Sequence, residues 1–507
     1  MSFPDLATGT STSTNDMKGK VILPSVLAIG FTGHRHLPDE AKSRAQILQL
    51  LEEKKEQTQG IVYGVSSAAA GGDLLFAETC IHLGLPLRIL LPMPKEQFRK
   101  DFDGPTWKRV EDVLRLAMSV EVTGGEQDRD ARYYECGIET VLQSRLLLAL
   151  WDGEPSRGLG GTEQIVSFAK IEGRPIVWIH SHTGAIQYFN EDRELLNDPE
   201  LDFLNTLAES KSEPDIGTPG KLAQAWFEKI DTNATHASPR VRRLASIPIL
   251  CTAAASVLST VGSLAGGTAV WVGIGSGLGF TVGALPALLK MHQQQTIWAR
   301  IRGATEICRS NLAFWKTPSP YNVIGPEVVP ELDGMLMSLN FLKMSDRMSH
   351  KADLEEFKRE YREVRVQGQM DFFSKSAAKS GKKARQYQIA IMGSTALALV
   401  ANIWMLLNSV WLKGVSQAPW KQILPLSGSV FFQVATIAGA MIVVNDYQRR
   451  RTRYRELHHL LKEWDKQLEF AKTWPIVMRI AEMVEKALLA EVIEWKSLIL
   501  HHKLPRR

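Results

Sequence analysis

The sequence has few cysteines, no apolar N-terminal leader and, over one long stretch, no charge at all. The four cysteines are Cys80, Cys136, Cys251 and Cys308, which are too scattered for a zinc site or a disulfide framework. They are therefore expected to be small buried residues of a protein in a reducing compartment. The first twenty residues are polar and rich in Ser and Thr, without the basic and apolar regions of a secretion signal. This start predicts a disordered tail over residues 1–20 and a cytoplasmic first domain.

Charge is distributed unevenly along a chain of 507 residues, a length that predicts several domains. Residues 1–240 carry 25 Lys and Arg against 35 Asp and Glu, a balance of −10, whereas residues 241–507 carry 35 against 20, a balance of +15. A basic half is typical of proteins that bind nucleic acid or an anionic membrane surface. Within it, residues 244–289 contain no Asp, Glu, Lys or Arg, which excludes a simple soluble protein.

Residues 21–185 alternate short apolar runs with helical patterns. Strands are expected at 21–33, 60–67, 85–92, 144–153 and 174–180, and helices at 39–59, 74–84 and 163–173. Such runs imply a parallel sheet covered by helices on both faces. The predicted fold is therefore an α/β, Rossmann-like domain over 21–185, followed by a polar connector at 186–240.

Two apolar hairpins follow the connector. The stretch 244–289 fits two membrane helices with a turn at 266–267, and residues 386–412 and 424–444 fit a second pair. Both pairs are flanked by basic residues, which are Arg240, Arg242, Arg243, Lys290, Arg300, Arg302, Lys382, Lys383, Arg385 and the run 448–455. This pattern predicts four spans with both termini in the cytoplasm. Trp404, Trp411 and Trp420 would then lie near the outer leaflet. The alternative is two pairs of buried helices in a soluble protein.

Each hairpin is followed by an amphipathic region rich in charged residues. The arrangement of a hairpin followed by amphipathic helices therefore occurs twice, over 241–375 and 376–507. The second helix of the first hairpin carries glycines four residues apart, at Gly275, Gly279 and Gly283. Small residues at this spacing allow close helix packing in lipid. The packing could occur within one chain or between copies of a homo-oligomer. No charge lies inside a span, which disfavours an ion-coupled transporter.

Two glycine turns end the first two expected strands. Gly33 precedes His34 and Arg35, whose guanidinium could reach a phosphate or simply face solvent. Gly71, Gly72 and Asp73 occupy the matching position, where Asp73 could cap the helix or accept a ribose hydroxyl. Glycines there let the backbone approach a phosphate at a helix N-terminus.

A third loop follows the strand that ends at Trp151. Asp152 comes directly after it, and a glycine-rich segment then opens a helix with Gly160, Gly161, Thr162 and Glu163. Such a loop forms an anion-binding nest to which Thr162 could add a hydroxyl. Because parallel strands end at one edge of their sheet, the three loops are expected to form one nucleotide-binding site there.

The motifs GFTGHRHL, SSAAAGGDLLFAE and LLLALWDGEPSRGLGGTEQIVSFA resemble the SLOG superfamily, the Rossmannoid group that includes DprA and the Lonely-Guy phosphoribohydrolases. The membrane half, with ARIRGATEICRSNLAFWKTPSPY, looks like the SLATT effectors, here as two modules in tandem. The resemblance implies a nucleotide-derivative sensor coupled to a membrane-perturbing or pore-forming effector in a bacterial defence system, placed in the inner membrane.

One departure bears on catalysis. Lonely-Guy enzymes carry a Glu three residues after the loop Thr, and Ile165 stands at that position here. Because isoleucine cannot stabilise an oxocarbenium-like centre or orient water, binding without turnover is expected, with no cofactor and no metal. The alternatives are a membrane-anchored nucleotide hydrolase using Asp73, Asp152 or Glu163, and a basic nucleic-acid scaffold. The scaffold is disfavoured because membrane topology already accounts for the basic charge.

Overall fold

The computed structural model describes residues 21–123, 128–156, 158–190, 198–208, 217–265, 269–318, 329–347, 353–411 and 420–499. The chain forms two compact units, residues 1–229 with 314–352, and residues 230–313 with 353–507. The expected tail at 1–20 and the expected turn at 266–267 lie outside the described residues. The same holds for Arg157 in the glycine-rich loop and for Lys413 between the two helices of the second hairpin.

The first unit contains a seven-stranded sheet. Its strands are β1 (Val26–Gly33), β2 (Ile61–Ser66), β3 (Leu87–Leu91), β4 (Ser119–Val122), β5 (Leu146–Trp151), β6 (Ile176–His180) and β7 (Ile186–Phe189). Their order is β4-β3-β2-β1-β5-β6-β7, and every pairing is parallel except β6 with β7. The expected Rossmann-like sheet is confirmed. Its two edge strands, β4 and β7, were not expected, since each has only four residues and lacks a long apolar run.

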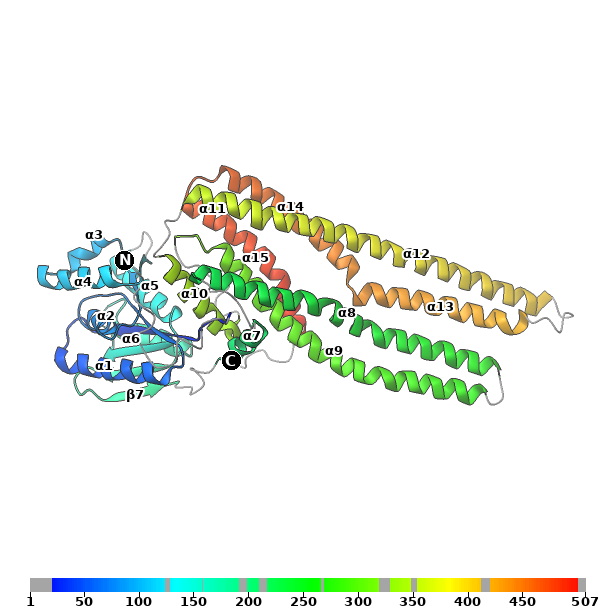
Figure 1. Cartoon of the computed structure of the whole chain (residues 1–507), viewed down its shortest axis with the longest axis horizontal. Helices are drawn as coiled ribbons and strands as arrows, with labels where there is room; N and C mark the ends of the chain where they lie inside the picture. Colours follow the sequence, from blue (N-terminus) through cyan, green and yellow to red (C-terminus); the bar gives the residue numbers. More distant parts are fainter. Residues whose placement is uncertain are drawn as a thin grey trace. The chain divides into compact units, whose positions relative to one another are not determined.

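Helices cover both faces of this sheet (Figure 1). The described helices of the unit are α1 (Glu40–Gln57), α2 (Gly72–His82), α3 (Lys95–Phe98), η1 (Arg99–Asp101), α4 (Gly104–Leu116), α5 (Arg129–Leu142), α6 (Thr162–Ile171), α7 (Pro199–Ala208), η3 (Pro330–Leu332) and α10 (Asp333–Arg347). Leu27, Ile29 and Phe31 of β1 point into a core shared with α1, α2 and α4. Val26 and Ala28, which alternate with them, face the opposite core.

Helix α10 belongs to this unit although it follows the first hairpin in sequence. Met337, Phe341 and Met344 pack against Val26 and Ala28 of β1 in a buried cluster. The charge pattern groups this segment with the first membrane module, whereas the structure lays it on the sheet. The chain therefore leaves the α/β unit, forms the first hairpin and returns.

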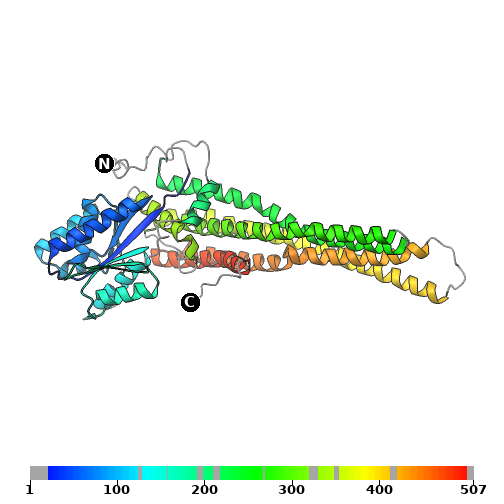
Figure 2. The same ribbon diagram turned by 90° about the horizontal axis from the view of Figure 1, so that it is seen from below.

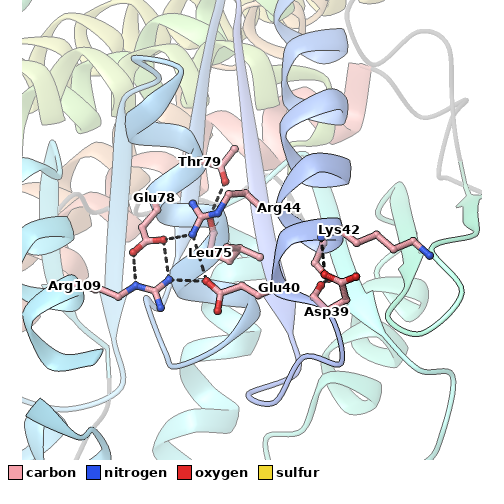
Figure 3. Close-up of polar contacts among 9 residues, drawn as sticks. Asp39, Glu40, Lys42, Arg44, Leu75, Glu78, Thr79 and Arg109 are labelled. Atoms are coloured by element: carbon pink, nitrogen blue, oxygen red, sulfur yellow. Dashed lines mark hydrogen bonds and ion pairs between the residues drawn. The ribbon is translucent and has the colours of Figure 1, made fainter. Parts of the chain in front are cut away.

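A charged cluster joins the three helices on the other face (Figure 3). Glu78 of α2 accepts hydrogen bonds from Arg109 of α4 at 2.7 Å and from Arg44 of α1 at 2.7 Å. Arg109 also reaches Glu40 of α1 at 2.9 Å. Partial burial opposes ionisation of Glu78, but the two arginines hold its pKa below the ordinary value. Because its charges are mutually paired, this cluster fastens α1, α2 and α4 together and offers no reactive group.

The second unit is helical. Its described elements are α8 (Pro219–Ala265), which begins in the first unit, α9 (Ala269–Ala313), α11 (Leu354–Glu360), the π-helical η4 (Tyr361–Gln367), α12 (Gly368–Trp411), α13 (Trp420–Val444), α14 (Tyr447–Phe470) and α15 (Trp474–Ile499). Helices α12 and α13 run side by side in both views (Figures 1 and 2). A left-handed residue, Asp446, separates α13 from α14.

Among the described residues of this unit, two helical segments are long and apolar enough to cross a membrane, Leu354–Leu407 and Val430–Phe470. Their most apolar windows have mean hydropathies of 1.9 and 1.4 and are only 11% and 6% buried. Apolar surface left uncovered in this way is suited to lipid. Length and composition thus give weak support for a membrane protein, and four spans stay a prediction.

A buried ion pair holds η4 against α15. Arg365 donates to Glu485 at 2.7 Å through Nε, and Tyr361 donates to the same carboxylate at 2.9 Å. Glu485 is fully buried. Because an unpaired buried carboxylate is costly, this contact specifies how the base of the second hairpin meets α15.

Candidate functional site

The candidate site lies where the strand order reverses. β1 has β2 on one side and β5 on the other, and chain connections leave β1 and β5 toward opposite faces. Open α/β sheets bind ligands outside the carboxyl ends of strands at such a switch point. The loops after β1, β2 and β5, here called the three-loop site, comprise residues 33–35, 71–73 and 152–163.

His34 and Asp152 meet directly across the switch point. The backbone of His34 donates to Leu150 at 3.1 Å, which continues the pairing of β1 with β5. The Nε2 atom of the His34 ring lies 3.1 Å from the amide nitrogen of Asp152 and 3.0 Å from the Oδ1 atom of Asp152. A neutral Nε2 accepts the amide hydrogen, whereas a protonated one would donate to the carboxylate. Burial opposes ionisation of Asp152, but the Glu154 amide and His34 hold its pKa below the ordinary value.

The loops after β1 and β2 touch through their glycines. The Gly72 amide donates to the His34 carbonyl at 2.9 Å. Gly71 has φ +88°, and a Cβ there would lie 2.4 Å from the carbonyl oxygens of His34 and Arg35. A Cβ on Gly33 would lie 3.3 Å from Cα of Gly72. Glycine is required at this contact because any side chain on Gly71 would force the two loops apart.

Asp73 lies beneath this contact and is 8% exposed. Its Oδ1 accepts a hydrogen bond from the Ser67 hydroxyl at 2.8 Å, and the Gly33 backbone also donates to the carboxylate. Burial raises the pKa of Asp73 to about 7, against the opposing effects of Ser67, Gly33 and Arg35. The N-cap of α2 is Gly71, without a side-chain capping hydrogen bond, so the predicted capping role of Asp73 is not observed. Its pKa instead places its change of protonation near neutral pH.

The glycine loop before α6 is folded onto α5. Gly160 has φ +80°, and a Cβ there would lie 2.8 Å from the Tyr134 amide nitrogen. Its own amide donates to Gln164 at 2.8 Å. A Cβ on Gly161 would lie 2.0 Å from the Ser156 hydroxyl. The loop therefore accommodates no side chain at Gly160, and a side chain at Gly161 would require the Ser156 hydroxyl to move.

The helix that follows contributes less chemistry than its motif suggests. Thr162 is largely buried at the first turn, and Glu163 accepts a hydrogen bond from Ser167 at 2.7 Å within its own helix. Ile165 is 2% exposed and packs against Gly137 of α5, where an added Cβ would lie 2.4 Å from its Cδ1. The position at which Lonely-Guy enzymes carry a Glu thus belongs to the core here.

Two residues of the site were missed by sequence reasoning, Tyr133 of α5 and Asp101 of η1. The guanidinium of Arg35 lies 4.6 Å from the centroid of the Tyr133 ring, a cation–π contact. The Tyr133 hydroxyl donates to Asp101 at 2.5 Å. Gly160 also approaches the backbone and Cβ of Tyr133, so this residue contacts both the β1 loop and the glycine loop. No local motif marks either residue, because their role arises only from tertiary contacts.

The membrane glycines divide into two faces of α9. A Cβ on Gly273 would lie 2.9 Å from Cα of Gly262 on α8, so this face packs within the hairpin. At Gly275 and Gly279 a Cβ would meet no atom of the described residues within 4 Å. Gly283 lies in α9, and its surroundings are outside the described part. Gly275 and Gly279 of the predicted glycine face therefore do not contact α8 among the described residues.

Among the described residues, no group of three or more His, Cys, Asp or Glu side chains could hold a metal ion. A scan against protein-family models finds no matching family. A search of the curated proteins finds no related protein.

Proposed function

We propose that this chain is a membrane-anchored sensor that binds a nucleotide-derived ligand at the three-loop site without consuming it. The observation that carries the proposal is the convergence of glycine loops, Arg35 and Asp73 at the switch point of a doubly wound sheet. Helix N-termini and glycine amides suit phosphate, and Asp73 suits a ribose hydroxyl. Burial of Ile165 supports binding without cleavage.

The proposed output is a change in the membrane part, either a pore or a local disruption of the bilayer. In this proposal four helices span a bacterial inner membrane, both termini are cytoplasmic, and the protein is a homo-oligomer in a defence system. The long uncovered apolar helices and the open Gly275 and Gly279 face support it. These assignments rest on the SLOG and SLATT resemblance as well as on the fold.

A second candidate is a phosphoribohydrolase-like enzyme. It is favoured by one observation, the buried Asp73 carboxyl with a pKa of about 7 at the edge where ligands bind. A carboxyl that titrates near neutral pH can act as a general acid or base. Turnover separates the two candidates, because a sensor leaves its ligand intact.

The test is to titrate the purified full-length protein with AMP and with ADP-ribose and to measure binding by calorimetry. Arg35→Ala should weaken binding by about 1.5–3 kcal/mol, because it removes a charge-assisted hydrogen bond to phosphate. Arg115→Ala, which removes an exposed arginine from α4, is the matched control and should bind normally. Chromatography of the same mixtures should recover intact ligand. Steady multiple-turnover release of ribose phosphate would instead establish the enzyme.

A further inference from the structure

The base of the second hairpin carries an unusual concentration of positive charge. Residues 375–385 of α12 and 447–455 of α14 contain ten Lys and Arg and no Asp or Glu. We call this set the basic collar: Lys375, Lys379, Lys382, Lys383, Arg385, Arg449, Arg450, Arg451, Arg453 and Arg455. Acidic residues border the collar at Asp371, which lies 3.9 Å from Lys375, at Asp446 directly before α14, and at Glu456.

The two halves of the collar lie side by side, so their charges form one surface. The rings of Phe373 on α12 and Tyr454 on α14 are 5.2 Å apart. Arg451 crosses α12 at Gly381, where an added Cβ would lie 3.2 Å from its Cδ. Figure 1 shows α14 lying along α12. Like charges gathered on adjoining helices repel one another, and an anionic partner would relieve that repulsion.

A stacked tyrosine pair marks where the collar meets apolar surface. The rings of Tyr387 and Tyr447 are 5.9 Å apart and nearly parallel. Past Tyr387, α12 exposes Ile389 and Met392, which are 60% and 73% exposed, and before Tyr447 the chain exposes Val443 at 77%. Tyrosine prefers the boundary between hydrocarbon and headgroups. The pair therefore identifies the level of the headgroups on this unit.

We propose that the basic collar binds the phosphate headgroups of anionic phospholipids. A helix rises about 1.5 Å per residue, and each headgroup region is about 5–8 Å thick. Lys382 and Lys383 then lie within the headgroups, about 6–8 Å from Tyr387, and Arg449 and Arg450 lie nearer to Tyr447. Lys375, about 18 Å away, lies beyond them. A nucleic acid would favour charge that continues away from the apolar surface, whereas this charge is confined beside it.

The inference requires that the second hairpin spans a bilayer, and it is independent of the ligand proposed for the three-loop site. Full-length protein in neutral detergent is titrated with phosphatidylglycerol or phosphatidylcholine, and retained lipid is counted by native mass spectrometry while the melting temperature is followed. Phosphatidylglycerol should be retained and should stabilise the protein, and phosphatidylcholine should do neither. Inorganic phosphate at the same concentration should leave the melting temperature unchanged.

The decisive comparison is between variants of equal charge. Lys382→Gln with Lys383→Gln should weaken phosphatidylglycerol binding about ten-fold or more, since each basic residue near an anionic surface contributes to the attraction. Lys462→Gln with Lys472→Gln removes the same charge from exposed positions far along the chain from Tyr447 and should bind as the parent does. Arg449→Gln with Arg450→Gln repeats the test on the other helix, so that a folding defect in one variant does not decide the result.

Three results would overturn the proposal. The first is equal retention of both lipids by the parent protein. The second is equal phosphatidylglycerol affinity in the collar variants and the control. The third is a melting temperature that inorganic phosphate or a short DNA duplex raises in the parent but not in the collar variants, while phosphatidylglycerol leaves it unchanged. The last result would assign the collar to a free anion or to nucleic acid.

Discussion

Asp73 combines a buried carboxyl with a position at the start of a helix. A helix N-terminus normally favours the ionised form of a carboxyl, yet burial here outweighs the hydrogen bonds from Ser67 and Gly33. The residue is held by contacts from the ends of β1 and β2 as well as by its own helix. Its protonation is therefore linked both to folding and to whatever occupies the three-loop site.

This linkage predicts a pH-dependent stability. The pKa of Asp73 rises from 3.8 to about 7 on folding, so between these values the folded protein holds a proton that the unfolded chain has lost. The free energy of unfolding then falls as pH rises through this window, by at most about 4 kcal/mol at about 1.4 kcal/mol per pKa unit. Asp73→Asn should melt above the parent at pH 8 and close to it near pH 4.

Thermal denaturation of the full-length protein from pH 4 to pH 8 measures the difference. Asp112→Asn, an exposed carboxyl on α4, is the control and should show no comparable divergence. A constant difference between Asp73→Asn and the parent across this range would contradict the raised pKa.

At the scale of elements, the two glycine faces of α9 have separate consequences. Gly273 approaches the backbone of α8, whereas Gly279 faces away from the described residues. Close contacts of small residues provide packing in lipid, where hydrophobic association is absent. The first face therefore packs within the hairpin, and the second is the one that the proposed oligomer would use.

Leucine substitutions should separate these roles. Gly273→Leu should lower the melting temperature in detergent, because its Cβ would lie 2.9 Å from Cα of Gly262 and 3.0 Å from the Leu258 carbonyl. Gly279→Leu should keep the parent's melting temperature and its ligand affinity within a few-fold, but abolish ligand-dependent dye release from proteoliposomes. If Gly279→Leu releases dye as the parent does, the open face has no part in the output.

At the scale of the whole molecule, the proposed coupling has an energetic requirement. An effector that harms its own cell when active must rest almost entirely in the inactive state. Moving such an equilibrium from about 1:99 to about 99:1 requires a ligand that prefers the active state by about 5.5 kcal/mol. The three-loop site draws contacts from β1, β2, α5 and α6, so a polyanionic ligand that closes these loops could supply that difference.

The membrane topology can be tested directly. Reporter fusions at residue 507 and within 413–423 should lie on opposite sides of the membrane, because ten Lys and Arg flank the base of the second hairpin and only two, Lys413 and Lys421, lie in its loop. A fusion at residue 20 should report the same side as residue 507. If the fusions at 413–423 and 507 report one side, the second hairpin does not cross the bilayer.

The sequence by itself determined the elements whose signal is local. Buried parallel strands read as short apolar runs, so β1, β2, β3, β5 and β6 were predictable. The glycines that follow such runs were predictable too, with Gly33 at the end of β1 and Gly71 at the start of α2. Long uncharged helices were predictable for the same reason, since hydropathy is a property of consecutive residues.

Only the tertiary structure decided which distant residues meet. Tyr133 reaches Arg35 from almost a hundred residues away, α10 returns to the sheet after the first hairpin, and Ile165 turns into the core beside Gly137. Each outcome depends on many weak contacts between elements, and no periodicity along the chain records them. The same holds for Gly273 and Gly279, which share a spacing pattern but face different surroundings.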